Sequence, residues 1–147
     1  MLSLNKVEIA QGDFRLSAHF DMDAGQRIAV IGPSGAGKST LVNALCGFVD
    51  VAAGEITQDG RDITTALPSE RGMAMLFQDN NLFAHLSIAQ NVGLGIRPAL
   101  RLTQSETAQV MTALDRVALQ GFAQRKPFEL SGGQQSRAAL ARALVQS

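Results

Sequence analysis

The stretch that decides the fold runs from Gly32 to Thr40 and reads G-P-S-G-A-G-K-S-T. The apolar residues Ile28 to Ile31 precede it, and a helix-like segment, Leu41 to Leu45, follows it. A glycine loop between a strand and a helix is the arrangement that wraps a polyphosphate. The alternative is an ordinary glycine-rich turn, yet the four fixed positions would arise by chance in fewer than about one in a hundred chains of this length.

Each residue type in this loop has a physical task. The glycines allow backbone torsions and close approaches that a side chain would block. Successive backbone N–H groups can then converge on phosphate oxygens, and the following helix adds the positive end of its dipole. Lys38 would lie near the β- and γ-phosphates, and Ser39 would offer its hydroxyl to Mg²⁺. The predicted site for a nucleoside triphosphate comprises Gly32, Pro33, Ser34, Gly35, Ala36, Gly37, Lys38, Ser39 and Thr40.

Length and composition limit the possible partners. The 147 residues make one domain or part of one, and Lys plus Arg equals Asp plus Glu at 13 each. This balance gives no electrostatic case for nucleic acid or an anionic membrane surface as a direct partner. Met1 to Ala10 is not a signal peptide, and the longest uncharged stretch, Asn80 to Ile96, is too polar to span a membrane. We expect a cytoplasmic chain whose single cysteine, Cys46, is buried rather than reactive.

Apolar residues recur with strand periodicity in the N-terminal half. Phe14 to Phe20 alternates apolar and polar residues, which predicts a strand with one buried face. Leu2 to Ile9 is predicted to be its antiparallel neighbour, and Gly54 to Thr57 a further short strand before a turn. The apolar runs Ile28 to Ile31 and Met73 to Phe77 are predicted to be buried strands of a parallel sheet.

Sequence patterns in the C-terminal half of the chain predict helices. Thr103-Gln104-Ser105-Glu106 fits a capping box, and the apolar residues after it follow helical spacing to Val117. A final helix is predicted from Gln134 to Val145.

A second glycine-containing segment, Leu130-Ser131-Gly132-Gly133-Gln134, stands just before that final helix. Ser131 can cap the helix, and the two glycines bare the backbone N–H groups beside it. A helix N-terminus with a free hydroxyl suits a γ-phosphate, although an ordinary helix cap is the alternative. Between the two glycine segments, Gln78 follows a predicted strand and could reach Mg²⁺ or an attacking water; a solvated loop glutamine is its alternative.

The order of glycine loop, F-Q-D and L-S-G-G-Q resembles the ATP-binding subunits of ABC transporters over essentially the whole chain. The resemblance implies an α/β P-loop NTPase fold of ABC type, with an N-terminal antiparallel β subdomain and a helical subdomain. It makes Gly32 to Thr40 the Walker A loop for ATP and Mg²⁺, with Ser39 and Gln78 near the metal. Gln78 would belong to the Q-loop, and the signature residues Ser131, Gly132, Gly133 and Gln134 would contact ATP bound to a second subunit.

The resemblance also implies partners. Two ATP-binding subunits would close head to tail around two ATP molecules, on the cytoplasmic side of a membrane permease. The segment Met75 to Gly95 is most similar to the ATPase subunit of bacterial thiamine importers, which receive solute from a periplasmic binding protein. Phe83 to Gly95 would then dock a permease helix, although core packing explains part of its apolar content. Importers of other small solutes, such as iron or polyamines, and non-transport ABC ATPases are the alternatives.

The sequence departs from this family in its last residues. After Glu129 it has no Asp, Glu or His that could polarise water or support Mg²⁺, so no catalytic residue is identified. His19 and His85 lie before the signature and are better explained as surface histidines. Residues 1–147 are therefore expected to be an N-terminal fragment that lacks Walker B, the D-loop and the switch histidine, and to hydrolyse ATP at background rate. An inert remnant that binds nucleotide weakly is a further possibility.

A second departure concerns the adenine ring. The family usually stacks the base on an aromatic residue near the end of the first hairpin, but this chain has no Tyr and no Trp. Gln11 stands about where that ring is expected, and Phe14 is the nearest aromatic candidate. Core packing is the alternative role for Phe14.

Overall fold

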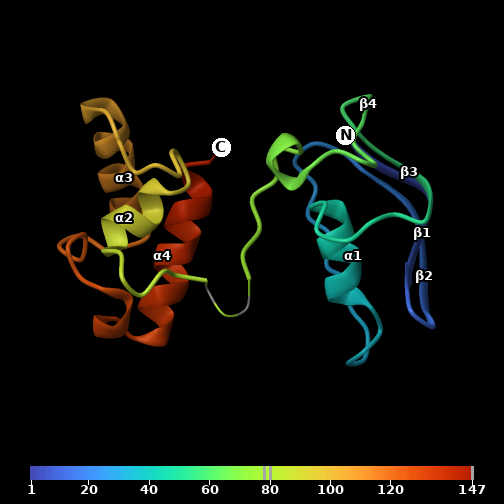
Figure 1. Cartoon of the computed structure of the whole chain (residues 1–147), viewed down its shortest axis with the longest axis horizontal. Helices are drawn as coiled ribbons and strands as arrows, with labels where there is room; N and C mark the ends of the chain where they lie inside the picture. Colours follow the sequence, from blue (N-terminus) through green and yellow to red (C-terminus); the bar gives the residue numbers. More distant parts are fainter. Residues whose placement is uncertain (78, 80, 147) are drawn as a thin grey trace. The chain divides into compact units, whose positions relative to one another are not determined.

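The computed structural model describes residues 1–77, 79 and 81–146. The chain divides into two compact units, Met1–Met73 and Ala74–Ser147, and each has its own hydrophobic core. The first unit is rich in strands and the second is helical (Figure 1). None of the helices in the described part of the chain is long and apolar enough to cross a membrane.

The first unit is built on a four-stranded antiparallel sheet with the order β2-β1-β3-β4. Its leading hairpin is the predicted one, because Leu4 pairs with Phe20 and Ile9 pairs with Leu16. The predicted strand around Ile56 is also present and pairs with the other side of the first strand. The strands are β1 (Leu2–Gln11), β2 (Phe14–Met22), β3 (Ala53–Gln58) and β4 (Arg61–Asp62).

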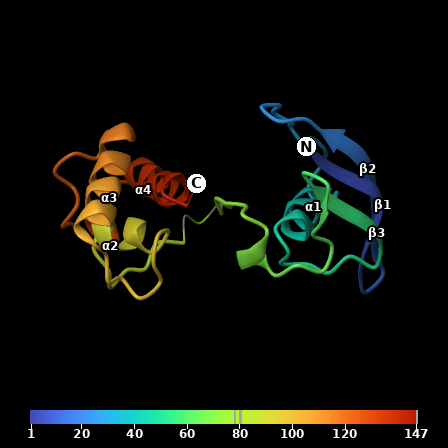
Figure 2. The same cartoon turned by 90° about the horizontal axis from the view of Figure 1, so that it is seen from above.

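Helix α1 (Lys38–Leu45) packs on one face of this sheet (Figure 2). Leu41 and Ala44 are the buried residues of the helix, and they lie in the same core as the inward residues of β1 and β3. The buried core of this unit consists of Leu2, Leu4, Val7, Ile9, Leu41, Ala44, Ile56 and Ile63. Because α1 begins directly after the glycine loop, this packing fixes the loop to the sheet.

The second unit is a helical bundle around one core. Its helices are α2 (Ile88–Gly93), α3 (Gln104–Arg116) and α4 (Gly132–Leu144). The predicted capping box starts α3: the Thr103 hydroxyl accepts from the Glu106 N–H at 3.2 Å, and the Glu106 carboxylate accepts from the Thr103 N–H at 2.7 Å. The core residues are Ile88, Val92, Val110, Ala113, Leu114, Val117, Leu119, Ala123, Leu130, Ala138 and Ala141.

Two predicted strands are wrong. Residues 28–31 and 73–77 form no strand, although both runs are apolar. The Ile31 side chain is 89% exposed and Leu76 is 50% exposed, so neither run is the buried strand that the sequence predicts. A strand exists only where a neighbouring backbone satisfies its N–H and C=O groups, and no segment in the described part of the chain pairs with either run.

Candidate nucleotide site

The glycine loop turns into α1 through left-handed backbone. Gly35 has φ +81° and Gly37, the N-cap residue, has φ +86°, a region that residues with a Cβ rarely adopt. The first intrahelical bond runs from the Leu41 N–H to the Gly37 carbonyl, at 2.9 Å. No side chain caps the helix, so its first N–H groups face outward with the positive end of the dipole. This geometry can receive an anion.

The hairpin holds this loop in place. A Cβ at Gly37 would lie 2.6 Å from both the Leu16 Cδ1 and the Phe14 Cζ atoms, which is closer than side chains tolerate. The first residues of β2 therefore pack directly on the backbone of the loop. The shape of the loop is thus fixed by glycine torsions and by contact with the hairpin together.

Lys38 reaches back over the loop. Its ammonium donates to the Gly32 carbonyl at 2.8 Å and to the Pro33 carbonyl at 2.7 Å. A phosphate would hold this ammonium more strongly than the neutral carbonyls do, because it adds the attraction between two opposite charges to the hydrogen bonds. The Lys38 Nζ atom is therefore held at the loop, in position to exchange carbonyls for a phosphate.

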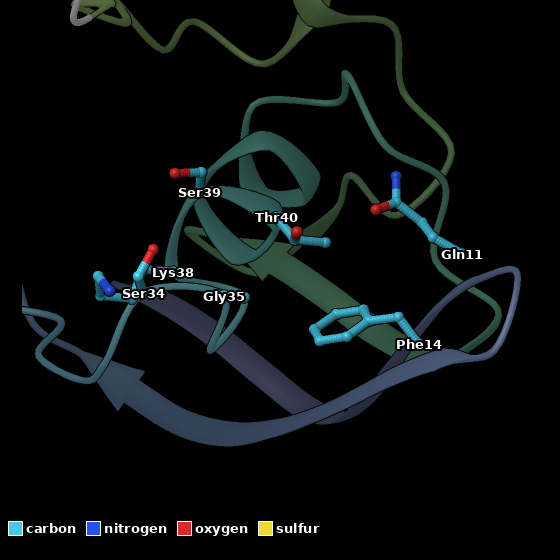
Figure 3. A pocket seen from close by; sticks show the side chains of 8 residues that line it. Gln11, Phe14, Ser34, Gly35, Lys38, Ser39 and Thr40 are labelled. Carbon is cyan, nitrogen blue, oxygen red and sulfur yellow. The ribbon is translucent and has the colours of Figure 1, made fainter.

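A pocket of about 300 Å³ lies beside the loop. Figure 3 shows Ser34 and Lys38 at one end and the side chains of Gln11 and Phe14 at the other. Of the nine predicted loop residues, six line it. The full lining is Gln11, Phe14, Ser34, Gly35, Gly37, Lys38, Ser39 and Thr40.

A magnesium ion fits this end of the site through one protein hydroxyl. The Ser39 side chain is exposed and makes no hydrogen bond to the described residues. Mg²⁺ is commonly held by one or two protein oxygens with substrate phosphates and waters, which a lone hydroxyl can satisfy. No cluster of three or more His, Cys, Asp or Glu side chains occurs among the described residues, so they hold no ready-made cage for a metal. Gln78 lies outside the described residues.

Arg71 supports the other end of α1, and sequence analysis missed it. Its side chain is 4% exposed and donates to the Ala44 and Leu45 carbonyls, at 2.8 and 2.9 Å, where the helix ends. It also donates to the Thr64 and Ala66 carbonyls, at 2.9 Å each. Burial lowers the pKa of Arg71. A lone arginine after a 3-10 turn carries no periodic signal, so only the fold reveals this role.

Cys46 follows α1 and is buried, as predicted. Burial raises the pKa of its thiol, and the nearby Arg71 charge opposes that rise. A raised pKa lowers the thiolate population and with it the reactivity.

The second glycine segment forms the start of α4 in the second unit. Ser131 and Gln134 make a capping box: the Ser131 hydroxyl accepts from the Gln134 N–H at 3.3 Å, and the Gln134 carbonyl oxygen accepts from the Ser131 N–H at 2.9 Å. The predicted cap is therefore present. Gly132 and Gly133 have no left-handed φ, and a Cβ at either would meet nothing within 4 Å.

The two histidines have ordinary surface contacts. His19 is exposed, and its Nδ1 accepts from the Lys6 N–H at 3.3 Å. The exposed ring of His85 lies edge-on to Phe83, with 6.0 Å between the ring centroids. The predicted loop residues therefore lie together within the first unit, and the predicted signature residues lie together within the second unit.

Comparisons with known proteins identify the family of the chain. The sequence model for the family described as ABC transporter matches residues 16–147. The thiamine import ATP-binding protein ThiQ of Cereibacter sphaeroides is 54% identical over all 147 residues, and that of Escherichia coli K12 is 43% identical over 145. The chain spans 64% and 62% of the length of these two relatives.

A solved structure of MJ0796, described as a dimeric bacterial ABC transporter cassette, also resembles the chain. The TM-score is 0.83 at 29% identity, over 99% of this chain and 70% of that one. A second MJ0796 structure, described as a dimeric post-hydrolysis state with ADP and Pi, matches equally well.

Proposed function

The chain belongs to the ABC transporter family, and from that premise we propose that it is the ATP-binding, energy-coupling part of a bacterial importer. The observation that carries the proposal is the uncapped N-terminus of α1 with Lys38 folded over the glycine loop. A polyphosphate would accept hydrogen bonds from the loop N–H groups, and Lys38 would leave its two carbonyls for the β- and γ-phosphates. The Ser39 hydroxyl would share the Mg²⁺ that offsets the phosphate charge.

The signature segment supports assembly with a second subunit. Gly132 and Gly133 are exposed helical residues whose glycine identity the folded unit does not require. Bare backbone at a helix N-terminus lets an outside phosphate approach closely, which is the role we assign to Ser131, Gly132, Gly133 and Gln134 in a homodimer. The dimeric form of the related cassettes supports this assignment. Gln78 would connect the Mg²⁺ site to the membrane partner.

The permease would dock on the segment before α2. Phe83 is 49% exposed, while the buried Asn91 side chain pins the backbone around it. The Asn91 amide nitrogen donates to the carbonyls of Phe83, Leu86 and Ser87, and its oxygen accepts from the Phe83 N–H at 2.7 Å. A rigid loop with an exposed aromatic ring is suited to bind a partner helix. The chain would thereby lie on the cytoplasmic face of the membrane, with the periplasmic binding protein contacting only the permease.

Thiamine is the proposed solute, because the relatives that match the full chain carry that name. No residue of the site recognises the solute itself, so a different small solute is the competing proposal. Vesicles that hold the permease and the complete ATPase, supplied with the periplasmic binding protein, separate the two. Thiamine should stimulate ATP hydrolysis, and equal stimulation by iron or a polyamine would contradict the thiamine assignment.

The ATP-binding proposal is tested by calorimetric titration of the 147-residue chain with Mg-ATP. Lys38→Ala should weaken binding at least tenfold, because it removes the only ammonium within reach of the phosphates in the described loop. Lys126→Ala is the matched control, since the Lys126 ammonium also donates to a carbonyl, at His85, but lies in the other unit. Equal loss in both variants would contradict the site. Hydrolysis by this chain should stay at background, since residues after Glu129 include no carboxylate or histidine to orient water.

A further inference from the structure

The pocket beside the glycine loop extends beyond what a triphosphate needs. Its phosphate end is lined by Ser34, Lys38 and Ser39, and its other end by Gln11 and Phe14 (Figure 3). A nucleotide whose phosphates lie on the loop must direct its sugar and base either into solvent or along this pocket. Because Gln11 and Phe14 line the same pocket as the loop residues, the second path leads past their side chains.

We propose that Gln11 hydrogen-bonds the edge of the nucleobase and accepts adenine and guanine alike. This inference rests on the proposed binding of a nucleoside triphosphate at the glycine loop. It adds that a carboxamide, rather than a stacked aromatic ring, contacts the hydrogen-bonding edge of the base.

The chemistry of the carboxamide supports this role. A glutamine side chain carries one acceptor oxygen and one NH₂ donor group, side by side. Adenine presents an N–H donor beside a ring-nitrogen acceptor, and guanine presents a carbonyl acceptor beside a ring N–H donor. The two edges have opposite polarity, so a carboxamide fixed in one orientation would choose between them, whereas one that can turn over would pair with both.

Gln11 is free to turn over. It ends β1 next to the hairpin turn, its side chain is exposed, and the carboxamide makes no hydrogen bond to the described residues. The backbone of Gln11 is nevertheless fixed, because it pairs with Phe14 across the hairpin. The structure therefore holds the position of this side chain but not the orientation of its donor and acceptor.

Phe14 supplies the apolar surface under the base. Its ring edge touches the loop at Gly37, which holds the ring at the boundary between the phosphate end and the Gln11 end. A ring anchored in this way can contact the sugar or base without selecting among bases. The hydrogen bonds to the edge of the base come from Gln11.

The test is calorimetric titration of the 147-residue chain with Mg-ATP, Mg-GTP and inorganic tripolyphosphate. We expect ATP and GTP to bind with affinities within about threefold of each other, and tripolyphosphate to bind about fivefold more weakly. Gln11→Met keeps the length of the side chain but removes its hydrogen bonds. It should weaken the binding of both nucleotides by a similar factor and leave tripolyphosphate binding unchanged.

Gln11→Glu should create a preference for guanine over adenine. A carboxylate only accepts hydrogen bonds, so it suits the two adjacent N–H donors of guanine and repels the ring nitrogen of adenine. The ratio of GTP to ATP affinity should rise at least fivefold. Gln124→Met is the matched control, because Gln124 is exposed in the other unit and does not line the pocket beside the glycine loop.

The outcomes separate the two proposals. If Lys38→Ala abolishes binding but the Gln11 variants leave the three affinities unchanged, the nucleotide site stands and the role of Gln11 is overturned. If the original chain already prefers ATP over GTP by more than tenfold, the inference is also overturned. If neither nucleotides nor tripolyphosphate bind, the proposed function itself fails.

Discussion

Helices α1 and α4 both begin in glycine-rich segments, but the two sets of glycines meet different demands. At α1, Gly37 has left-handed φ, and a Cβ there would overlap Leu16 and Phe14. At α4, Gly132 and Gly133 have ordinary torsions and open space around them. The folded chain therefore requires glycine in the first segment and not in the second. In the proposed homodimer, the two glycines of α4 would instead serve a nucleotide bound by the second subunit.

The largest expected effect concerns the far end of the same helix. Arg71→Met should destabilise the first unit by about 3–5 kcal/mol, because the carbonyls of Ala44, Leu45, Thr64 and Ala66 lose a buried charged donor. Denaturant unfolding of the variant measures the change. Arg61→Met is the control in β4, where the side chain is exposed and makes no hydrogen bond to the described residues. Equal effects in both variants would contradict the assigned role of Arg71.

Next in size is Gly37→Ala, for which we expect a loss of about 2–4 kcal/mol from left-handed strain and the contact with Leu16 and Phe14. Gly35→Ala separates the two causes. Gly35 has φ +81° but no atom within 4 Å of a Cβ, so its cost should be only about 1 kcal/mol. Similar losses at the two positions would show that packing of the hairpin on the loop is unimportant.

A smaller, pH-dependent effect distinguishes the capping boxes of α3 and α4. The backbone N–H of Thr103 and the Arg97 side chain hold the pKa of Glu106 below its usual range, whereas the corresponding Gln134 cannot ionise. A carboxyl whose pKa is lower in the folded state contributes stability above its unfolded pKa, and loses it as the pH falls through the folded pKa. Glu106→Gln should therefore lower the Tm at neutral pH and leave it unchanged in acid. A pH-independent difference would contradict this origin.

The smallest effect has the opposite sign. Gly133→Ala should stabilise α4 by about 0.5 kcal/mol, since alanine loses less backbone entropy in a helix and nothing obstructs its Cβ. The Tm of the variant measures this gain. A destabilised variant would mean that the fold itself requires glycine at this position, and the contrast with α1 would fail.

Features set by neighbouring residues were more predictable than strands that need a distant partner. The glycine loop, the cap at Ser131 and the hairpin of β1 and β2 follow from local torsions, hydrogen bonds between near neighbours and period-two alternation. The strands expected at 28–31 and 73–77 failed because strand formation depends on a distant partner that local sequence does not reveal. The contact of Arg71 with the end of α1 and the packing of Phe14 on Gly37 could not be predicted for the same reason. Each joins segments that are far apart in the chain.

The most direct test of the account is amide hydrogen exchange of the 147-residue chain with and without Mg-ATP. ATP should protect the N–H groups of residues 37–40, which face outward at the uncapped start of α1. Those of residues 132 and 133 should stay unprotected while the chain is monomeric, because in the proposed homodimer they would contact a nucleotide held by the second subunit. Protection at 132 and 133 without protection at the glycine loop would contradict the account.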